Sequence, residues 1–266
     1  MITYFNLSEL ESCEVTGFDS SSTMRSVMLE KLTWVEAEEI LRKYDVVMIP
    51  LGARTKEHGP HLPLNTDWIT AEYLAERISA EVPVVVMPTI QYGYYPSFLE
   101  YPGSVSLGLE TFKEAVKDVC VSMSRYGVRK FYVLNTGVST LRGLKIAAEE
   151  LREMGIEMRY TDILEAGREA EEAISEQEGG THADEMETSM MLYIRPEVVE
   201  MGKAVKDYHP MAGRGLTRDP ENKDAGAYSA SGVYGDATLA NREKGKAAVE
   251  ARLRYIIEEL KELIRE

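Results

Sequence analysis

Three short runs of apolar residues constrain what this chain can fold into. They are VVMIPL at 46–51, VPVVVMP at 82–88 and FYVLN at 131–135. The segments 34–44, 67–80 and 109–126 between them repeat apolar residues at the spacing of a helix. Short apolar runs that alternate with amphipathic helices are typical of a mainly parallel sheet with helices on both faces. The sequence therefore predicts an α/β fold.

The rest of the chain is expected to complete one domain. The pattern predicts helices near 139–154, 184–195 and 240–265, and a further strand near 157–163. Residues 1–30 are polar and irregular, and we expect them to form an N-terminal extension. Residues 31–266 then form a single domain, in which 202–235 is a long irregular stretch.

The charge balance excludes two classes of partner. The 266 residues contain 30 Lys+Arg against 45 Asp+Glu, a formal net charge of −15. Such a surface repels phosphate backbones and anionic lipid, so we expect neither nucleic acid nor a membrane as partner. No stretch approaches the ~20 apolar residues of a membrane span, and the N-terminus does not read as a secretory leader. Cys13 and Cys120 lie far apart, which favours a reducing cytoplasm.

The loops that follow the strands are where chemistry is expected, because ligands bind beyond the carboxyl ends of parallel strands. The loop after 46–51 brings together Glu57, His58 and His61, and Asp67 follows at the start of the next helix. Imidazole and carboxylate groups are ligands of zinc and manganese. Asp67 suits an N-terminal cap of its helix equally well, so both interpretations stay open.

A second cluster of this kind lies at 180–188, where His182 precedes Glu187. On the expected helix, Glu187 shares a side with Met190 and Met191, which predicts a carboxylate facing the core. A carboxylate there is paired in a salt bridge, reaches out to solvent, or belongs to a metal or acid/base site. His209, which precedes a proline, is expected to be structural.

Other catalytic patterns are absent from the sequence. It has no GxSxG motif, neither cysteine lies beside a histidine, and Gly213-Arg214-Gly215 does not link a strand to a helix. The loop 91–104 is rich in aromatic residues that either line a polar pocket or serve packing. Its tyrosines are Tyr92, Tyr94, Tyr95 and Tyr101.

Four blocks of the sequence resemble the creatininase (creatinine amidohydrolase) superfamily of metal-dependent hydrolases. They are IPLGARTKEHGPHLPLNTD at 49–67, MPTIQYGYYPSFLEYPGSVSL at 87–107, HADEMETS at 182–189 and SGVYGDATLANREKG at 231–245. They occur in the order of the family. The resemblance implies a three-layer α/β/α fold and a homo-oligomer, often a hexamer. It also implies one or two divalent ions that activate a water for attack on a carbonyl-type carbon.

The resemblance assigns metal ligands unevenly. His58, Asp67 and Glu187 match ligand positions of the family. Lys56 stands where the family has another Glu ligand, and the adjacent Glu57 would take that role if the loop bulges. A family His ligand is replaced by Gly137. The resemblance therefore favours a single ion, zinc or manganese with iron as a third choice.

The remaining roles follow from the same comparison of motifs. His182 matches the acid/base histidine, while Thr181 replaces the acid before it and Asp184 replaces a glycine, so the proton relay is rebuilt from another side. We expect four residues to bind substrate: His61, Arg54, Lys56 and Tyr94.

The predicted function is a cytoplasmic metal-dependent hydrolase of a small polar, cyclic substrate. The bond is the C–N bond of a cyclic amide or formamide, or a C–C bond in an inositol-derived cyclic diketone, which would belong to carbohydrate or inositol metabolism. The alternative is a catalytically degenerate member that keeps the fold as a ligand-binding or assembly protein.

Overall fold

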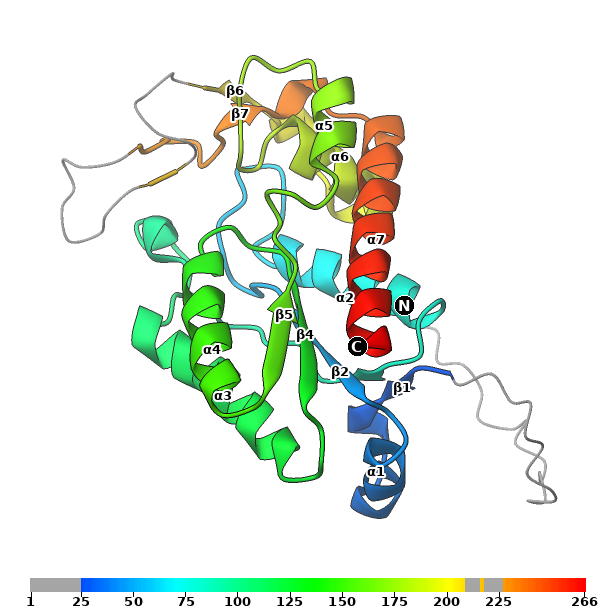
Figure 1. Ribbon diagram of the computed structural model, residues 1–266. Coiled ribbons are helices and arrows are strands. Elements are labelled where there is room, and N and C mark those ends of the chain that lie inside the picture. The colour runs from blue at the N-terminus through cyan, green and yellow to red at the C-terminus, as the bar shows by residue number, and fades with distance from the viewer. Residues whose placement is uncertain (1–24, 209–215, 218–226) are drawn as a thin grey trace, which may run out of the picture.

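A five-stranded parallel sheet forms the centre of the molecule (Figure 1). The structure is a computed structural model that describes residues 25–208, 216–217 and 227–266. The strands follow the order β1-β3-β2-β4-β5 across the sheet, and every neighbouring pair is parallel. Their bounds are Val27–Met28 (β1), Val46–Leu51 (β2), Val85–Val86 (β3), Lys130–Asn135 (β4) and Glu157–Tyr160 (β5). The predicted α/β fold is confirmed.

Helices cover both faces of the sheet, as the alternating pattern predicts. In Figure 1, α3 and α4 lie on one side of the strands and α7 on the other, with α2 beside it. The helices are α1 (Trp34–Leu41), α2 (Thr66–Ser79), α3 (Leu109–Ser124), α4 (Leu141–Glu153), α5 (Arg168–Ile174), α6 (Glu185–Ile194) and α7 (Arg242–Arg265).

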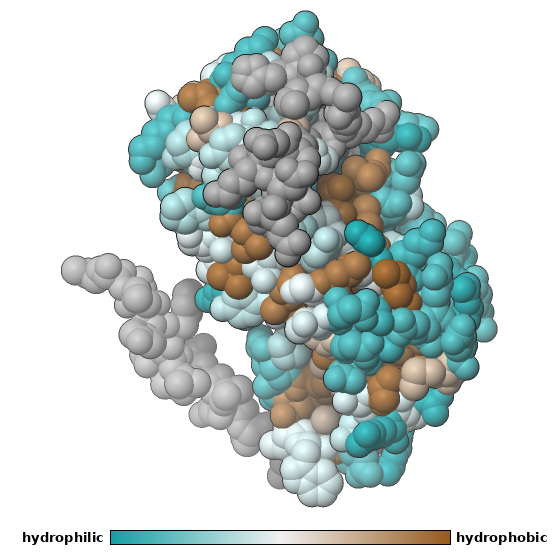
Figure 2. Space-filling model, turned by 90° about the vertical axis from the view of Figure 1, so that its left-hand side faces the viewer, coloured by the Kyte–Doolittle hydropathy of each residue, from teal (hydrophilic) through white to brown (hydrophobic). Residues whose placement is uncertain are grey.

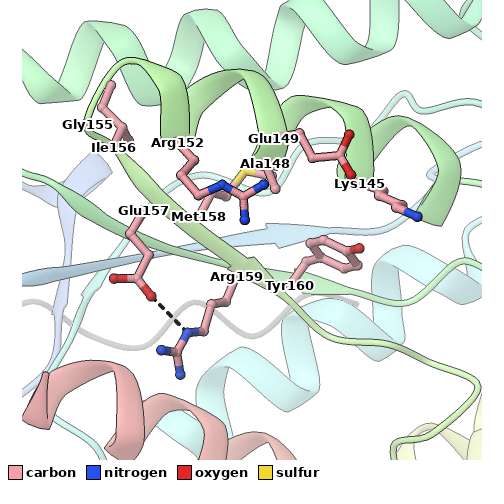
Figure 3. A pocket seen from close by; sticks show the side chains of 10 residues that line it. All are labelled: Lys145, Ala148, Glu149, Arg152, Gly155, Ile156, Glu157, Met158, Arg159 and Tyr160. Carbon is pink, nitrogen blue, oxygen red and sulfur yellow. Dashed lines mark hydrogen bonds and ion pairs between the residues drawn. The ribbon is translucent and has the colours of Figure 1, made fainter.

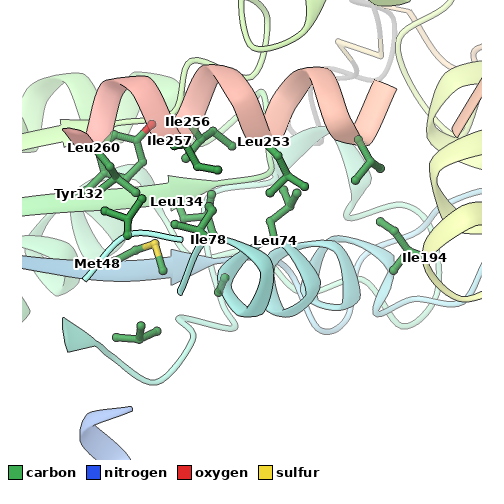
Figure 4. Close-up of a cluster of buried hydrophobic side chains, with 14 of the residues drawn as sticks. Met48, Leu74, Ile78, Tyr132, Leu134, Ile194, Leu253, Ile256, Ile257 and Leu260 are labelled. Atoms are coloured by element: carbon green, nitrogen blue, oxygen red, sulfur yellow. The ribbon is translucent and has the colours of Figure 1, made fainter. Parts of the chain in front are cut away.

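The alternation of side chains along each strand divides the core into two clusters. Val46 and Met48 of β2 face α2, α6 and α7, whereas Val47 and Ile49 face α3 and α4. Figure 4 shows Ile257 and other residues of α7 over the strands. Full burial of one such side chain stabilises the fold by about 1.5–3 kcal/mol.

Short elements appear where the sequence predicted none. Strand β1 lies within the segment expected to be an N-terminal extension, and Ser26 ties it to the sheet, since its Oγ donates to the Val82 carbonyl at 2.5 Å. Within the stretch 202–235 and just after it, β6 (Lys206–Asp207) and β7 (Gly235–Asp236) pair antiparallel. Two residues are too few to show a period in the sequence.

The outer edge of the sheet is charged. Strand β5 and α4 border a cavity of about 580 Å³ lined by residues within 145–160, and Arg159 and Glu157 form an ion pair of 3.0 Å there (Figure 3). Charged side chains on an edge strand discourage pairing with another chain. On the face shown in Figure 2, hydrophilic residues cover much of the surface, with apolar patches among them. Among the described helices, none is long and apolar enough to cross a bilayer.

The pairing of β2 with β4 positions the site. Leu51 and Asn135, the last residues of these strands, are partners in the ladder, so the loops that follow them start side by side. Thr136 Oγ1 donates to the carbonyls of Leu51 at 3.0 Å and Asp67 at 3.3 Å. The start of α2 is thereby held against the ends of both strands.

Candidate metal centre

The loop after β2 folds back onto the start of α2. The Trp68 amide donates to the Ala53 carbonyl at 3.1 Å, and a Cβ on Gly52 would lie 2.7 Å from the Asp67 carbonyl carbon. Only a glycine permits so close an approach. Asp67 is 2% exposed, and its carboxylate faces His58 and Lys56, so the carboxylate contacts side chains instead of capping α2.

His58 is fully buried, and its partners fix the role of each ring nitrogen. Nδ1 lies 2.8 Å from the Lys56 carbonyl, which can only accept, so Nδ1 carries a hydrogen. Nε2 lies 3.0 Å from Asp67 Oδ1 and 3.6 Å from Glu187 Oε1. In neutral His58, a nitrogen lone pair therefore faces two carboxylate oxygens.

Glu187 reaches this point from the first turn of α6. The Asp184 carboxylate accepts hydrogen bonds from the amides of Met186 and Glu187. Asp184 is therefore the N-cap of α6, and its carboxylate is directed at these amides and not at His182. Glu187 Oε2 accepts from the Ala183 amide at 2.6 Å. Its side chain is 22% exposed, so it borders the site and lies at the edge of the core.

His182 lies on the other side of Glu187 and pairs with Glu57. Its Nε2 is 3.1 Å from Glu57 Oε2 and 3.0 Å from the Glu57 carbonyl, both acceptors, so Nε2 carries a hydrogen. Its Nδ1 is 3.7 Å from Glu187 Oε2. Glu57, expected as a metal ligand, is directed instead at His182 and packs against Gly232, where any Cβ would overlap its carboxylate.

Lys56 is buried beneath this group. Its Nζ lies 2.8 Å from Asp67 Oδ2 and 4.8 Å from the centre of the Phe98 ring. Burial alone would lower the pKa of Lys56, but the negative charges of Asp67 and Glu187 outweigh burial and raise it. Burial opposes ionisation of Asp67 in turn, yet Lys56 and His58 hold the pKa of that carboxyl well below its usual range.

The neighbouring buried charges also shift the pKa values of His58 and Glu187. Burial and the charge of Lys56 oppose protonation of His58, but Asp67 and Glu187 outweigh them and raise its pKa. Burial would raise the pKa of Glu187, but the positive charges of His58, His182 and Lys56 lower it. A proton on Nε2 of His58 thus occupies the place where a cation would be held.

The donor set fits a divalent metal ion. His58, His182 and Glu187 form a group whose ligand atoms all lie within 4.8 Å of one another, and Asp67 Oδ1 adds a carboxylate oxygen beside His58. Nitrogen and carboxylate oxygen are the donors that zinc accepts, and three protein ligands leave a position open for water. Without a cation, converging carboxylates in a buried place are costly.

The four residues expected to bind substrate differ in their exposure and contacts. Lys56 and His61 are buried, and His61 Nε2 is 2.7 Å from Thr188 Oγ1, while burial lowers the pKa of His61 to about 4. Arg54 is exposed and stacks on Trp68 at 4.6 Å. Tyr94 packs against the core beside α3. Tyr95 and Phe98 of the same loop are the aromatic residues that contact the site.

A cavity of about 250 Å³, which none of these four residues lines, opens beside Glu187. Its polar lining comes largely from loops that follow β4 and β5 and from α5 and α7: Thr136, Arg168, Ser175, Gln177, Thr181 and Arg252. Sequence reasoning missed these residues because they form no motif. Thr136, directly after the carboxyl end of β4, is the residue among them whose position gives a signal. Cys13, His209 and Gly213-Arg214-Gly215 lie outside the described residues.

Sequence comparisons show to which family the chain belongs. The sequence model of creatininase, described as creatinine amidohydrolase, matches residues 30–260. The chain belongs to the creatininase family. Creatinine amidohydrolase of Pseudomonas putida is 28% identical over 260 residues, 90% of this chain and 97% of that protein. The 3-dehydro-scyllo-inosose hydrolase of Thermotoga maritima is 29% identical, covering 86% and 81%. The mycofactocin precursor peptide peptidase of Mycobacterium ulcerans is 28% identical, covering 86% and 89%.

Solved creatininase structures match the whole fold. A tryptophan-to-phenylalanine mutant of creatininase superposes with a TM-score of 0.74 at 26% identity, covering 90% of this chain and 99% of the other. A manganese form gives 0.72 at 27%, covering 91% and 100%. A glutamate-to-glutamine mutant of the Zn–Zn type gives 0.70 at 28%, again covering 91% and 100%. The family resemblance of the sequence is confirmed, and the chain is a hydrolase of the creatininase type.

Proposed function

We propose that this chain is a metal-dependent hydrolase that attacks a carbonyl carbon of a small polar, cyclic substrate. The observation that carries the proposal is the convergence of His58 Nε2, Asp67 Oδ1 and Glu187 Oε1. Zinc or manganese is the preferred ion, with iron as a third choice, because the donors are one imidazole and two carboxylates. When bound, such an ion polarises a carbonyl oxygen and makes its water acidic enough to be a nucleophile near neutral pH.

We assign the proton transfer to His182. Its Nε2 hydrogen is held by Glu57, which fixes the ring and leaves Nδ1 to take or give a proton. Phe98 lies 4.6 Å from the His182 ring and limits its rotation.

The substrate class is argued from the cavity beside Glu187. A volume of about 250 Å³ suits one small ring. Hydroxyl groups of Thr136 and Thr181 line it beside charged side chains such as Glu171 and Arg252, and this polar lining favours a hydroxylated or amide-bearing ring. Both candidate reactions have relatives in the family, an amide hydrolase and an inosose hydrolase. We expect either a cyclic amide or formamide C–N bond or a C–C bond of an inositol-derived cyclic diketone.

Metal content per chain tests the proposal. We expect about one zinc or manganese ion in the wild type, and its loss in His58→Ala, because the imidazole supplies a ligand. His61→Gln is the matched control, since it changes a buried histidine of the same loop whose recorded contact is Thr188. Wild-type protein that holds no ion after incubation with zinc and manganese would refute the proposal and favour the degenerate binding protein.

His182→Ala separates the two roles that this residue can have. We expect the ion to stay and the rate on cyclic amides or ketones to fall by about 10²–10⁴-fold, as for loss of a general acid/base. Loss of the ion in this variant would instead make His182 a metal ligand, in keeping with its place in the group with His58 and Glu187.

We further propose a cytoplasmic homo-oligomer, with a hexamer as the first expectation, and a hydrolase domain over 31–266. The buried free thiol of Cys120 suits a reducing compartment. Light scattering on the full chain measures the assembly, and a monomer at micromolar concentration would contradict it.

A further inference from the structure

The two oxygens of Asp67 face two different partners. Oδ1 lies 3.0 Å from His58 Nε2, on the side of Glu187, and Oδ2 lies 2.8 Å from the ammonium of Lys56. Asp67 therefore has one oxygen to offer a metal ion, while the other already holds a positive charge. We propose that Lys56 is a resident cation of the metal centre and limits it to a single divalent ion. The inference rests on the proposed function.

Lys56 is fixed in this place. The residue is 5% exposed, and its Nζ lies 4.8 Å and 5.4 Å from the ring centres of Phe98 and Tyr95. Faces of aromatic rings attract a cation and exclude water from it. A lysine so enclosed does not reach out to substrate, which was its expected role. Its charge acts on the carboxylates around it.

The balance of buried charge favours one ion. Three carboxylates act on the Lys56 ammonium, namely Asp67, Glu187 and Glu57. One divalent ion together with Lys56 balances these three negative charges. A second divalent ion would leave a net positive charge in a buried place, which is costly without further partners.

On the Oδ2 side of Asp67, Lys56 occupies the place that a second ion would need. One creatininase structure similar to this chain is a mutant of the Zn–Zn type. In the described part of this chain, one set of His, Cys, Asp and Glu side chains lies close enough together to hold an ion, namely His58, His182 and Glu187. An ion on Oδ2 would take the place of Nζ, because a zinc–oxygen bond is about 2.0–2.2 Å long.

Zinc stoichiometry of the full-length protein tests the inference. Each protein is incubated with excess zinc and desalted, and its ions per chain are measured by elemental analysis and by titration calorimetry. We expect one ion in the wild type and two in Lys56→Glu, which exchanges the ammonium for a carboxylate beside Asp67 Oδ2. Lys56→Arg is the matched control, because it keeps a positive charge beside Asp67 Oδ2. It should still bind one ion.

Lys56→Met carries the test if Lys56→Glu does not fold. It removes the charge and keeps an apolar side chain of similar length, so the one ion should bind at least about tenfold more tightly once the repulsion is gone. Two ions in the wild type would overturn the inference and leave the proposed hydrolase intact. A folded Lys56→Glu with one ion, or Lys56→Met with wild-type affinity, would overturn it too. No ion in the wild type would refute the proposed function itself.

Discussion

Gly52→Ala tests how the fold builds the metal centre. A Cβ at this position, directly after β2, would lie 2.7 Å from the carbonyl carbon of Asp67 and 2.9 Å from Cα of Trp68. The Cβ would overlap the Asp67 carbonyl oxygen most closely of all, and ordinary contact begins at 3.4 Å, so the start of α2 has to retreat by at least about 0.7 Å. These neighbours are backbone atoms, and no change of rotamer can absorb the overlap.

The retreat moves Asp67 away from His58, which is now 3.0 Å from it. We expect the free energy of unfolding to fall by about 1–3 kcal/mol, as for other overpacked sites. Zinc affinity should fall by about 10–100-fold, the usual cost of disturbing groups that position metal ligands. Titration calorimetry measures the affinity and urea unfolding the stability.

Gly202→Ala is the control, because nothing lies within 4 Å of a Cβ at that position. It should leave both quantities unchanged. If Gly52→Ala binds zinc as tightly as the wild type and unfolds at the same urea concentration, the close approach of this loop to α2 is not what places Asp67.

Three further predictions concern the same region and the core. The affinity for zinc should fall by about tenfold for each pH unit below the raised pKa of His58, because the ion must displace a proton from Nε2. Calorimetry in buffers of different ionisation enthalpy should detect the released proton, and an affinity that does not depend on pH would contradict the assignment. Gly232→Ala should displace the Glu57 carboxylate and lower the rate of hydrolysis by about 10–100-fold while the ion stays bound, since Glu57 only orients His182. An unchanged rate of hydrolysis would show that Glu57 has no part in the mechanism. In a Cys13→Ser background, Cys120 should react with a thiol reagent only on unfolding, because it is fully buried and burial raises its pKa to about 12; rapid reaction of the native protein would refute this.

Periodicity was enough to predict the sheet and most helices. Residues of β2 and β4 form continuous apolar runs because both of their faces are covered, and each predicted helix forms within a few residues of its expected bounds. The two-residue strand β1 escapes any pattern. Its pairing depends on β3, a partner that lies far along the chain.

The sequence already brought together the candidate metal ligands, but not the contacts of their neighbours. His58 lies in the loop after β2, and Asp67 and Glu187 lie in the first turns of α2 and α6. Whether Lys56 faces substrate or the interior depends on the aromatic residues of the loop 91–104, which close over it. The direction of Glu57 likewise depends on Gly232, far along the chain. Tertiary contacts of this kind leave no local signal.

The donor atoms of the centre come from segments that are made far apart in time. His58 and Asp67 emerge early in synthesis, whereas Glu187 follows only after β4 and β5, and α6 then packs on α7 at the end of the chain. A ribosome-bound chain that stops before α6 has no complete donor set. The ion is therefore expected to enter after translation, into a protein whose sheet is already assembled. Metal supply would then determine how much of the finished protein is active, and the bound ion would add to the stability of the folded chain.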